Sequence, residues 1–173
     1  MINSNFHQWL ASIFDQNESE VNELLDDKTA IQFLITWVLF ENRCFKGYMQ
    51  ISDIEPRAKY FANIEKFDVL LIFKEIIYFH ERYKDNVLYK NLYHDKPCKQ
   101  IDEILKVSID NLTEVESIVF ATYVVYRFRN NIFHGNKGVN SWLNFKDQID
   151  RCTKIMQQLI SHAETIQRQL KVV

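Results

Sequence analysis

The side chains best suited to chemistry in this chain lie together between positions 127 and 135. Two arginines, two asparagines and one histidine occur there: Arg127, Arg129, Asn130, Asn131 and His134. A guanidinium binds phosphate oxygens through a planar fork of donors. An imidazole accepts and donates protons near neutral pH. This combination favours chemistry on a phosphodiester, with Arg127, Asn131 and the nearby Lys137 as additional substrate contacts.

A long helix is expected to carry these side chains, because the residues that precede them are strongly apolar. Thr113 and Glu116 have the spacing of a capping box, in which each side chain binds a free backbone N–H at the start of a helix. Two of the three glycines in the chain follow the histidine, the first of them at Gly135. Glycine adopts the left-handed conformation that ends many helices. The sequence therefore predicts a helix over 113–134, with the polar side chains in its last turns.

This segment resembles the signature of the HEPN superfamily, a set of small helical-bundle domains of which many are metal-independent ribonucleases. In that signature an arginine, usually followed by a polar residue, precedes a histidine by four to six intervening residues. Arg129 and His134 fit the four-residue spacing, with Asn130 as the polar neighbour, and Phe133-His134-Gly135 also looks like many members. The resemblance implies an all-α bundle, RNA as the substrate, and no metal or other cofactor.

The resemblance also implies a reaction and an assembly. The 2′-hydroxyl of RNA would attack the adjacent phosphate and give a 2′,3′-cyclic phosphate and a 5′-hydroxyl. His134 would act as general base or acid, Arg129 would stabilise charge on the phosphorane oxygens, and Asn130 or Asn131 would orient the arginine or a phosphate. One histidine does not readily perform both proton transfers, so a homodimer with a composite cleft is implied. A toxin or antiviral-defence effector, restrained by an inhibitory partner or an activating trigger, is the implied biological role.

Helical geometry leaves open which arginine faces the phosphate. At about 100° per residue, Arg127 lies within about 20° of His134 around the helix, whereas Arg129 lies about 140° away. In one interpretation Arg129 is the active arginine, and its long side chain or an unwound helix end closes the angular gap. In the other, Arg127 faces the phosphate and Arg129 is a buried partner of Glu41. The asparagine that directly follows Arg129 favours the first interpretation.

Two other hypotheses compete with the nuclease. A histidine in the last turn of a helix can simply interact with the helix dipole and the free carbonyl groups. A catalytically silent HEPN-like module would use the same bundle for dimerisation or for binding a partner or nucleotide. Relatives of that kind often lose the arginine or the histidine, and this chain keeps both.

Composition limits the class of protein. The 173 residues suit a single domain over 1–173 with its core within 29–170, and three glycines and two prolines favour long helices. The net charge of −2 gives no global basic field, so RNA binding needs a local patch. The three cysteines are isolated, which excludes a metal site of regular spacing and fits the reducing cytoplasm. No membrane segment is expected.

Apolar periodicity predicts an up-and-down bundle of about five helices. The main four are centred on Trp37, Leu71, Val124 and Met156. The expected helices cover 4–14, 29–50, 56–84, 101–109, 113–134 and 141–171. The acidic residues 15–27 are expected to form a solvated connection, in which residues 21–25 can form a second short helix. The polar-aromatic residues 85–99 are expected to form another connection.

Overall fold

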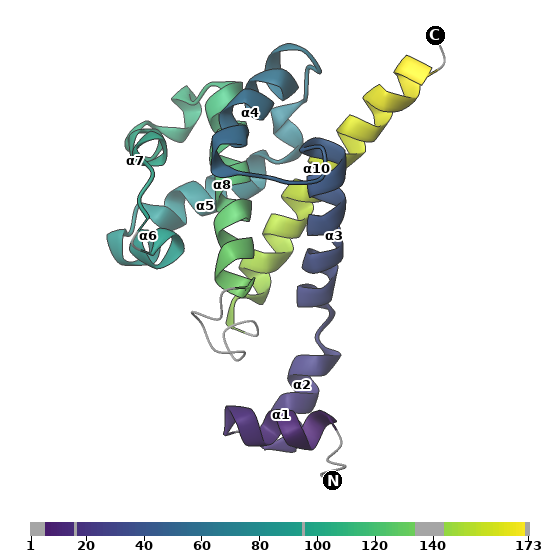
Figure 1. Cartoon of the computed structure of the whole chain (residues 1–173). Helices are drawn as coiled ribbons and strands as arrows, with labels where there is room; N and C mark the ends of the chain where they lie inside the picture. Colours follow the sequence, from purple (N-terminus) through teal and green to yellow (C-terminus); the bar gives the residue numbers. More distant parts are fainter. Residues whose placement is uncertain (1–5, 16, 95, 134–143, 172–173) are drawn as a thin grey trace.

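The computed structural model describes residues 6–15, 17–94, 96–133 and 144–171 (Figure 1). Throughout these residues the regular structure is helical and no strand occurs, which confirms the all-α class. The α-helices are α1 (Phe6–Phe14), α2 (Glu18–Asp26), α3 (Lys28–Cys44), α4 (Ile54–Asn63), α5 (Phe73–Tyr83), α6 (Asn86–Tyr93), α7 (Lys99–Lys106), α8 (Glu114–Phe133) and α10 (Lys146–Lys171). The described residues thus contain nine α-helices, more than the bundle of about five helices and the six helical segments that were expected.

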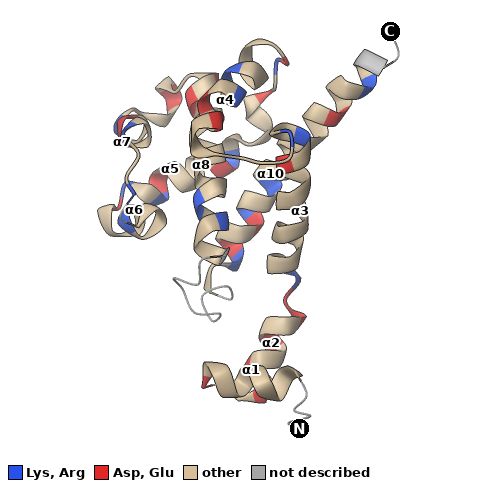
Figure 2. Ribbon diagram, viewed as in Figure 1, with Lys and Arg blue, Asp and Glu red and all other residues tan. Residues whose placement is uncertain are grey.

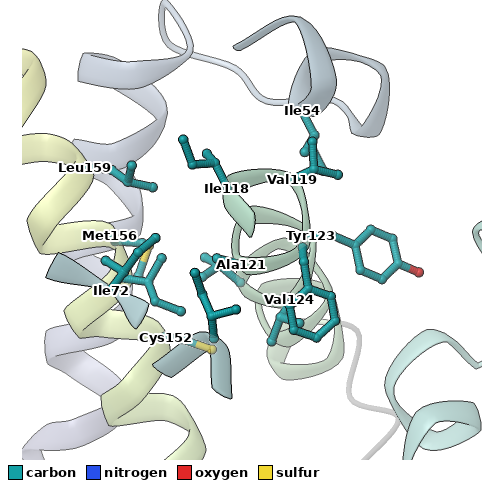
Figure 3. Close-up of a cluster of buried hydrophobic side chains, with 14 of the residues drawn as sticks. Ile54, Ile72, Ile118, Val119, Ala121, Tyr123, Val124, Cys152, Met156 and Leu159 are labelled. Atoms are coloured by element: carbon teal, nitrogen blue, oxygen red, sulfur yellow. The ribbon is translucent and has the colours of Figure 1, made fainter. Parts of the chain in front are cut away.

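Three long helices, α3, α8 and α10, form the centre of the fold. α3 and α10 run in the same direction. One ion pair joins their starts, Lys146 to Asp27 at 2.8 Å, and a second joins Arg43, near the end of α3, to Glu164 further along α10, at 2.8 Å. α8 runs in the opposite direction (Figure 1). Side chains from α8 and α10 meet in the apolar core drawn in Figure 3. The end of α8 therefore lies at the same end of the bundle as the starts of α3 and α10.

The predicted helix over 56–84 is two helices, α4 and α5. The backbone of Lys66 has φ 55°, in the left-handed region, so the helix cannot continue through it. The turn places Phe67 in the core, where it is 2% exposed. A short 3₁₀ helix, Val69–Leu71, follows and leads into α5. Leu71, expected at a helix centre, is 53% exposed.

Helix α6 occupies residues that were expected to form a connection. The Asp85 carboxylate accepts hydrogen bonds from the Val87 and Leu88 N–H groups, at 2.8 and 3.0 Å, and so starts the helix. Tyr89 and Leu92 bury against the core. The periodicity of α6 is hard to recognise in the sequence because the helix has only 8 residues.

Helices α1 and α2 form an N-terminal arm that projects from the bundle (Figure 1). The alternative of a short helix within residues 15–27 is therefore the one found, and α2 is longer than the 21–25 expected. The Asn17 side chain and Glu20 form a capping box at the start of α2. The arm has a small apolar cluster of its own, made by Leu10, Ala11 and Val21 with Phe14 against them.

Within the described residues, no helix combines the length and the apolar character needed to cross a bilayer.

Candidate functional site

The candidate site lies at the C-terminal end of α8. The predicted capping box starts this helix: the Thr113 N–H donates to Glu116 Oε2 at 2.9 Å, and the Glu116 N–H donates to Thr113 Oγ1 at 3.2 Å. The helix then continues without interruption to Phe133. The predicted catalytic His134 and the weaker candidate Lys137 lie outside the described residues.

Arg127 is buried and binds the end of α6. It is 6% exposed. Its Nε donates to the Leu92 carbonyl at 3.3 Å, and its Nη2 donates to the Tyr93 carbonyl. The last carbonyl groups of a helix have no partner within the helix itself. Arg127 therefore satisfies groups that α6 leaves free.

Asn131 acts with Arg127 on the same helix end. One turn further along α8, its Nδ2 donates to the Leu92 carbonyl at 3.1 Å, and the residue is 8% exposed. Just past these carbonyls the chain leaves α6 at His94, whose φ of 48° is in the left-handed region. The two α8 side chains thus hold both the helix end and the turn that follows it.

Arg129 lies on the other side of α8 and is half-buried. Its guanidinium carbon lies 5.5 Å from the centre of the Trp37 ring, on α3. Its Nη1 donates to Asn130 Oδ1 at 3.0 Å. A cation over an indole face is attracted by the ring quadrupole. The neighbouring asparagine and the tryptophan together orient this guanidinium, and Trp37 is a contact that no sequence motif pointed to.

Glu41, the alternative partner of Arg129 considered above, lies at the opposite end of the bundle. Its backbone carbonyl accepts the hydrogen bonds that end α3, from the N–H groups of Phe45 and Gly47. Its Oε1 accepts a hydrogen bond from the Met49 N–H at 3.2 Å. The Glu41 carboxylate thus binds the backbone just beyond α3, whereas the contacts described for Arg129 are with Trp37 and Asn130.

A small cavity of about 40 Å³ lies beside the Arg127 side of α8. Polar groups from three helices line it: Arg82 from α5, Asn91 from α6 and Asn131 from α8. Phe128 and Phe145 supply apolar walls. The cavity has about the size of one or two water molecules. Arg82 and Asn91 carry no motif in the sequence, and only the packing of α6 brings them here.

Positive charge is concentrated at this end of α8. Its two arginines are the only lysine or arginine residues in the helix, and Figure 2 shows them as blue segments on its lower half. Nearby on α10, the Arg151 guanidinium lies 3.9 Å from the centre of the Tyr78 ring and binds Asp147 at 3.0 Å. This ion pair neutralises the acidic first turn of α10.

The described residues were compared with what a metal site or a reactive thiolate needs. They contain no group of three or more His, Cys, Asp or Glu side chains able to hold a metal ion. Burial raises the pKa of the Cys44 thiol to about 12, and it also raises that of Cys152. Both thiols are therefore protonated at neutral pH and unsuited to act as nucleophiles.

Comparison with family models, with curated proteins and with solved structures found no match to this chain.

Proposed function

We propose that this protein is a metal-independent endoribonuclease of HEPN type, with Arg129 as its active arginine. The observation that carries the proposal is the double support of the Arg129 guanidinium by the Trp37 ring and the Asn130 amide. A half-buried arginine at the end of a core helix, oriented by an aromatic ring and a neighbouring amide, suits a phosphate.

The two arginines then have separate roles. Arg129 stabilises the charge that develops on the phosphorane oxygens, because a guanidinium held in place needs little reorganisation during the reaction. Arg127 is a positioning residue, since its hydrogen bonds to Leu92 and Tyr93 fix the last turns of α8 against α6. Asn130 orients Arg129, and Asn131 acts with Arg127.

The reaction needs no nucleophile from the protein. The 2′-oxygen of RNA forms a bond to the adjacent phosphorus and loses its proton to a base. The bond from phosphorus to the 5′-oxygen breaks, and that oxygen receives a proton from an acid. His134 supplies one of these transfers, and His134 of a second copy supplies the other. The products are a 2′,3′-cyclic phosphate and a 5′-hydroxyl.

The proposed cellular role is a cytoplasmic toxin or antiviral-defence effector that acts as a homodimer. Uncontrolled RNA cleavage would harm the cell that makes it. An inhibitory partner or an activating trigger therefore belongs to this proposal.

The test is incubation of the purified protein with RNA and with DNA of the same sequence, in the presence of a metal chelator. We expect cleavage of RNA only, with cyclic phosphate ends detected by mass spectrometry. His134→Ala should abolish cleavage and Arg129→Ala should reduce it by about 10²–10³-fold, while circular dichroism shows an unchanged helical fold for both. Cleavage that depends on added metal, or that survives in His134→Ala, would falsify the mechanism.

A second candidate is a catalytically silent helical module for dimerisation or partner binding. The apolar side chains of Ile31, Ile35 and Val38 on α3 are 52%, 57% and 64% exposed, and they favour this possibility. Wild-type protein that leaves RNA intact, even after treatment that releases bound inhibitors, would support it against the nuclease.

A further inference from the structure

A groove of about 490 Å³ lies between α6 and α7, beside the end of α5. Its volume is within the range of about 300–1,000 Å³ that is usual for ligand sites. Three tyrosines line it, Tyr83 from α5 with Tyr89 and Tyr93 from α6, and Leu105 of α7 adds to its apolar part. We call it the tyrosine groove.

The tyrosine rings form a preformed aromatic wall. Tyr83 and Tyr89 are 4% and 8% exposed, whereas Tyr93 is half-buried and is the most accessible of the three. Tyr93 packs edge-on against Tyr89, with ring centres 4.8 Å apart and planes at 77°. Rings that neighbours already hold lose little freedom when a ligand binds. The wall therefore suits a flat ligand such as a nucleobase, which stacks on aromatic side chains whatever its sequence.

Asp102 provides a hydrogen-bond acceptor of fixed direction in the groove. This residue of α7 is partly exposed, and its Oδ1 accepts a hydrogen bond from the Tyr89 hydroxyl at 2.7 Å. An ionised carboxylate can only accept hydrogen bonds. A base that lies against the rings therefore meets an acceptor, and N–H groups on its edge are favoured.

Tyr123 of α8 adds a second polar group behind this carboxylate. Figure 3 shows its ring on the side of α8 away from α10, with the hydroxyl oxygen outermost. The residue is 1% exposed, and its hydroxyl has no hydrogen-bond partner among the described residues. Burial raises the pKa of Tyr123, and the neighbouring Asp102 and Tyr93 raise it further, so the hydroxyl is protonated at neutral pH. The polar side of the groove thus retains a donor that the described chain does not use.

Guanine matches a fixed carboxylate better than the other bases of RNA do. Its Watson–Crick edge carries two N–H groups side by side, at N1 and N2, and one carboxylate can accept both. Adenine and cytosine each place an amino group beside an acceptor nitrogen, and the N–H of uracil lies between two carbonyl groups. These acceptors are repelled by a carboxylate, so Asp102 favours guanine.

Two lysines at the rim of the groove suit the phosphates of a strand. Lys84 and Lys106 line it. Each binds a glutamate on its own helix or beside it, Glu81 at 2.6 Å and Glu103 at 2.9 Å. Exposed ion pairs of this kind contribute little stability, and an ammonium group has three donors. Both lysines can therefore contact a phosphate as well.

A second groove, of about 570 Å³, shares Lys106 but has a different character. Three glutamates line it, Glu55, Glu103 and Glu116, and its lining contains no aromatic side chain. Carboxylates repel phosphates, and a base finds no ring there. A strand bound in the tyrosine groove is therefore not expected to continue into this second groove.

Tyr93 links the tyrosine groove to the end of α8. Its ring lines the groove, while its backbone carbonyl accepts a hydrogen bond from Nη2 of Arg127. Arg127 is two residues before Arg129 on α8. A strand that occupies the groove therefore lies next to the helix end that carries the candidate site.

We infer that the tyrosine groove binds a guanine base of single-stranded RNA. The base stacks on Tyr93, its N1–H and N2–H groups donate to Asp102, and Lys84 and Lys106 contact the neighbouring phosphates. This inference rests on the proposed function, because the bound guanine fixes which phosphate of the strand reaches the end of α8.

The first experiment measures binding without cleavage. Full-length His134→Ala protein is titrated into fluorescently labelled single-stranded RNA that contains one guanine, and into the same RNA with adenine or inosine at that position. Fluorescence anisotropy should show binding to the guanine strand about 5–150-fold tighter than to the adenine strand. Inosine keeps N1–H and lacks the 2-amino group, so its strand should bind with intermediate affinity. Equal affinities for the three strands overturn the inference, and so does free GMP that binds as tightly as the guanine strand.

Variants of the groove are compared with matched variants elsewhere. Asp102→Asn should bind the guanine and adenine strands equally, whereas Asp110→Asn, at an exposed aspartate outside the groove, should keep the preference. Tyr93→Ala should weaken binding of both strands by about 5–150-fold, because it removes the stacking ring. Tyr48→Ala, at a tyrosine that is 67% exposed after α3, should leave binding unchanged. A guanine preference that persists in Asp102→Asn overturns the inference.

Photo-cross-linking locates the base without any change in the groove. RNA that carries 6-thioguanine keeps both N–H groups, and ultraviolet light should link it to peptides of α6 or α7 in the His134→Ala protein. Cross-links confined to other helices overturn the inference even if Tyr93→Ala fails to fold.

Cleavage by the wild-type protein separates this inference from the proposed function. Cuts should occur at a fixed number of nucleotides from a guanine, and Asp102→Asn should lose that fixed distance. Guanine-dependent binding without any cleavage defeats the nuclease and leaves the groove as an RNA site. Cleavage that ignores guanine and is unchanged in Asp102→Asn defeats the groove and leaves the nuclease.

Discussion

Arg127 and Arg129 lie two positions apart on α8 and face opposite sides of it. The guanidinium of Arg127 binds two carbonyl groups at the end of α6, and that of Arg129 lies over the Trp37 ring of α3. Two steps along a helix rotate the side-chain direction by about 200°. The sequence signature fits either arginine, but their surroundings predict different consequences of substitution.

Arg127→Ala should mainly reduce stability. It removes the donors from two carbonyl groups at a buried helix end, so the free energy of unfolding should fall by about 1–3 kcal/mol. Arg129→Ala loses an attraction to an aromatic ring worth about 0.5–1 kcal/mol, but cleavage should fall by about 10²–10³-fold. Urea unfolding and an RNA cleavage assay measure the two quantities. Equal effects of the two variants on both quantities would contradict the separation of roles.

Substitutions of the two asparagines should also differ in their effects, with Asn131 important for stability and Asn130 for cleavage. Asn131→Ala removes the hydrogen bond to the Leu92 carbonyl and should lower the free energy of unfolding by about 0.5–1.5 kcal/mol. Asn130→Ala should change it by less than about 0.5 kcal/mol and should slow cleavage, because Arg129 loses its orienting partner. Each variant is the control for the other. A stability loss in Asn130→Ala larger than that in Asn131→Ala would show that Asn130 is structural.

The capping box of α8 should contribute measurably to stability. Thr113→Ala removes the acceptor of the Glu116 N–H and should lower the free energy of unfolding by about 0.5–2 kcal/mol. Thr113→Ser keeps the hydroxyl and should retain most of the stability. Thermal unfolding followed by circular dichroism measures both variants. If Thr113→Ser were as unstable as Thr113→Ala, the hydroxyl group would be excluded as the source of this stabilisation.

Alkylation should distinguish the three thiols. Cys44 and Cys152 are buried and have raised pKa values, about 12 for Cys44, whereas Cys98 is partly exposed. Iodoacetamide at mildly alkaline pH should therefore label Cys98 first and label the other two only after unfolding. Peptide mass spectrometry gives the order. Early labelling of Cys44 in folded protein would contradict the packing of α3 against the core.

Acid should weaken the start of α10. The hydrogen bond from Arg151 lowers the pKa of Asp147 below its ordinary value. A carboxyl group whose pKa is lowered by folding stabilises the fold above its unfolded pKa, and this contribution is lost as the pH falls through the lowered pKa. Asp147→Asn should therefore be less stable than wild type at neutral pH and equally stable at a pH below both pKa values. Urea unfolding at several pH values measures this, and a pH-independent difference would argue against the ion pair.

Long apolar patterns in the sequence predicted the long helices well. The periods that indicated α3, α8 and α10 extend over several turns, and the Thr113 capping box is confirmed at the start of α8. The short helix α6 was not predicted, since two turns give too few repeats to establish a period. The break near Lys66 was also missed, because no glycine or proline marks its left-handed backbone.

The candidate site could be predicted in part. The signature placed the candidate residues in the last turns of a long helix, and that helix, α8, is present in the structure. Their role in catalysis remains a prediction, and His134 and Lys137 lie outside the described residues. Helical angles placed Arg127 on the same side of the helix as His134, where it could face a phosphate. In the structure the unpredicted helix α6 packs on that side and binds the side chains of Arg127 and Asn131. Angles on one helix cannot show which neighbour packs against it.

Asp27 joins the arm to the bundle without an intervening linker. It follows the last residue of α2 and precedes the first of α3, and its carboxylate binds both the Thr29 N–H and the ammonium group of Lys146. A single residue therefore sets the angle at which the arm leaves the bundle, and α10 braces it there. Because the arm has its own apolar cluster, a change in the backbone at Asp27 would reorient α1 and α2 together as a rigid unit and would leave the packing of the main core intact.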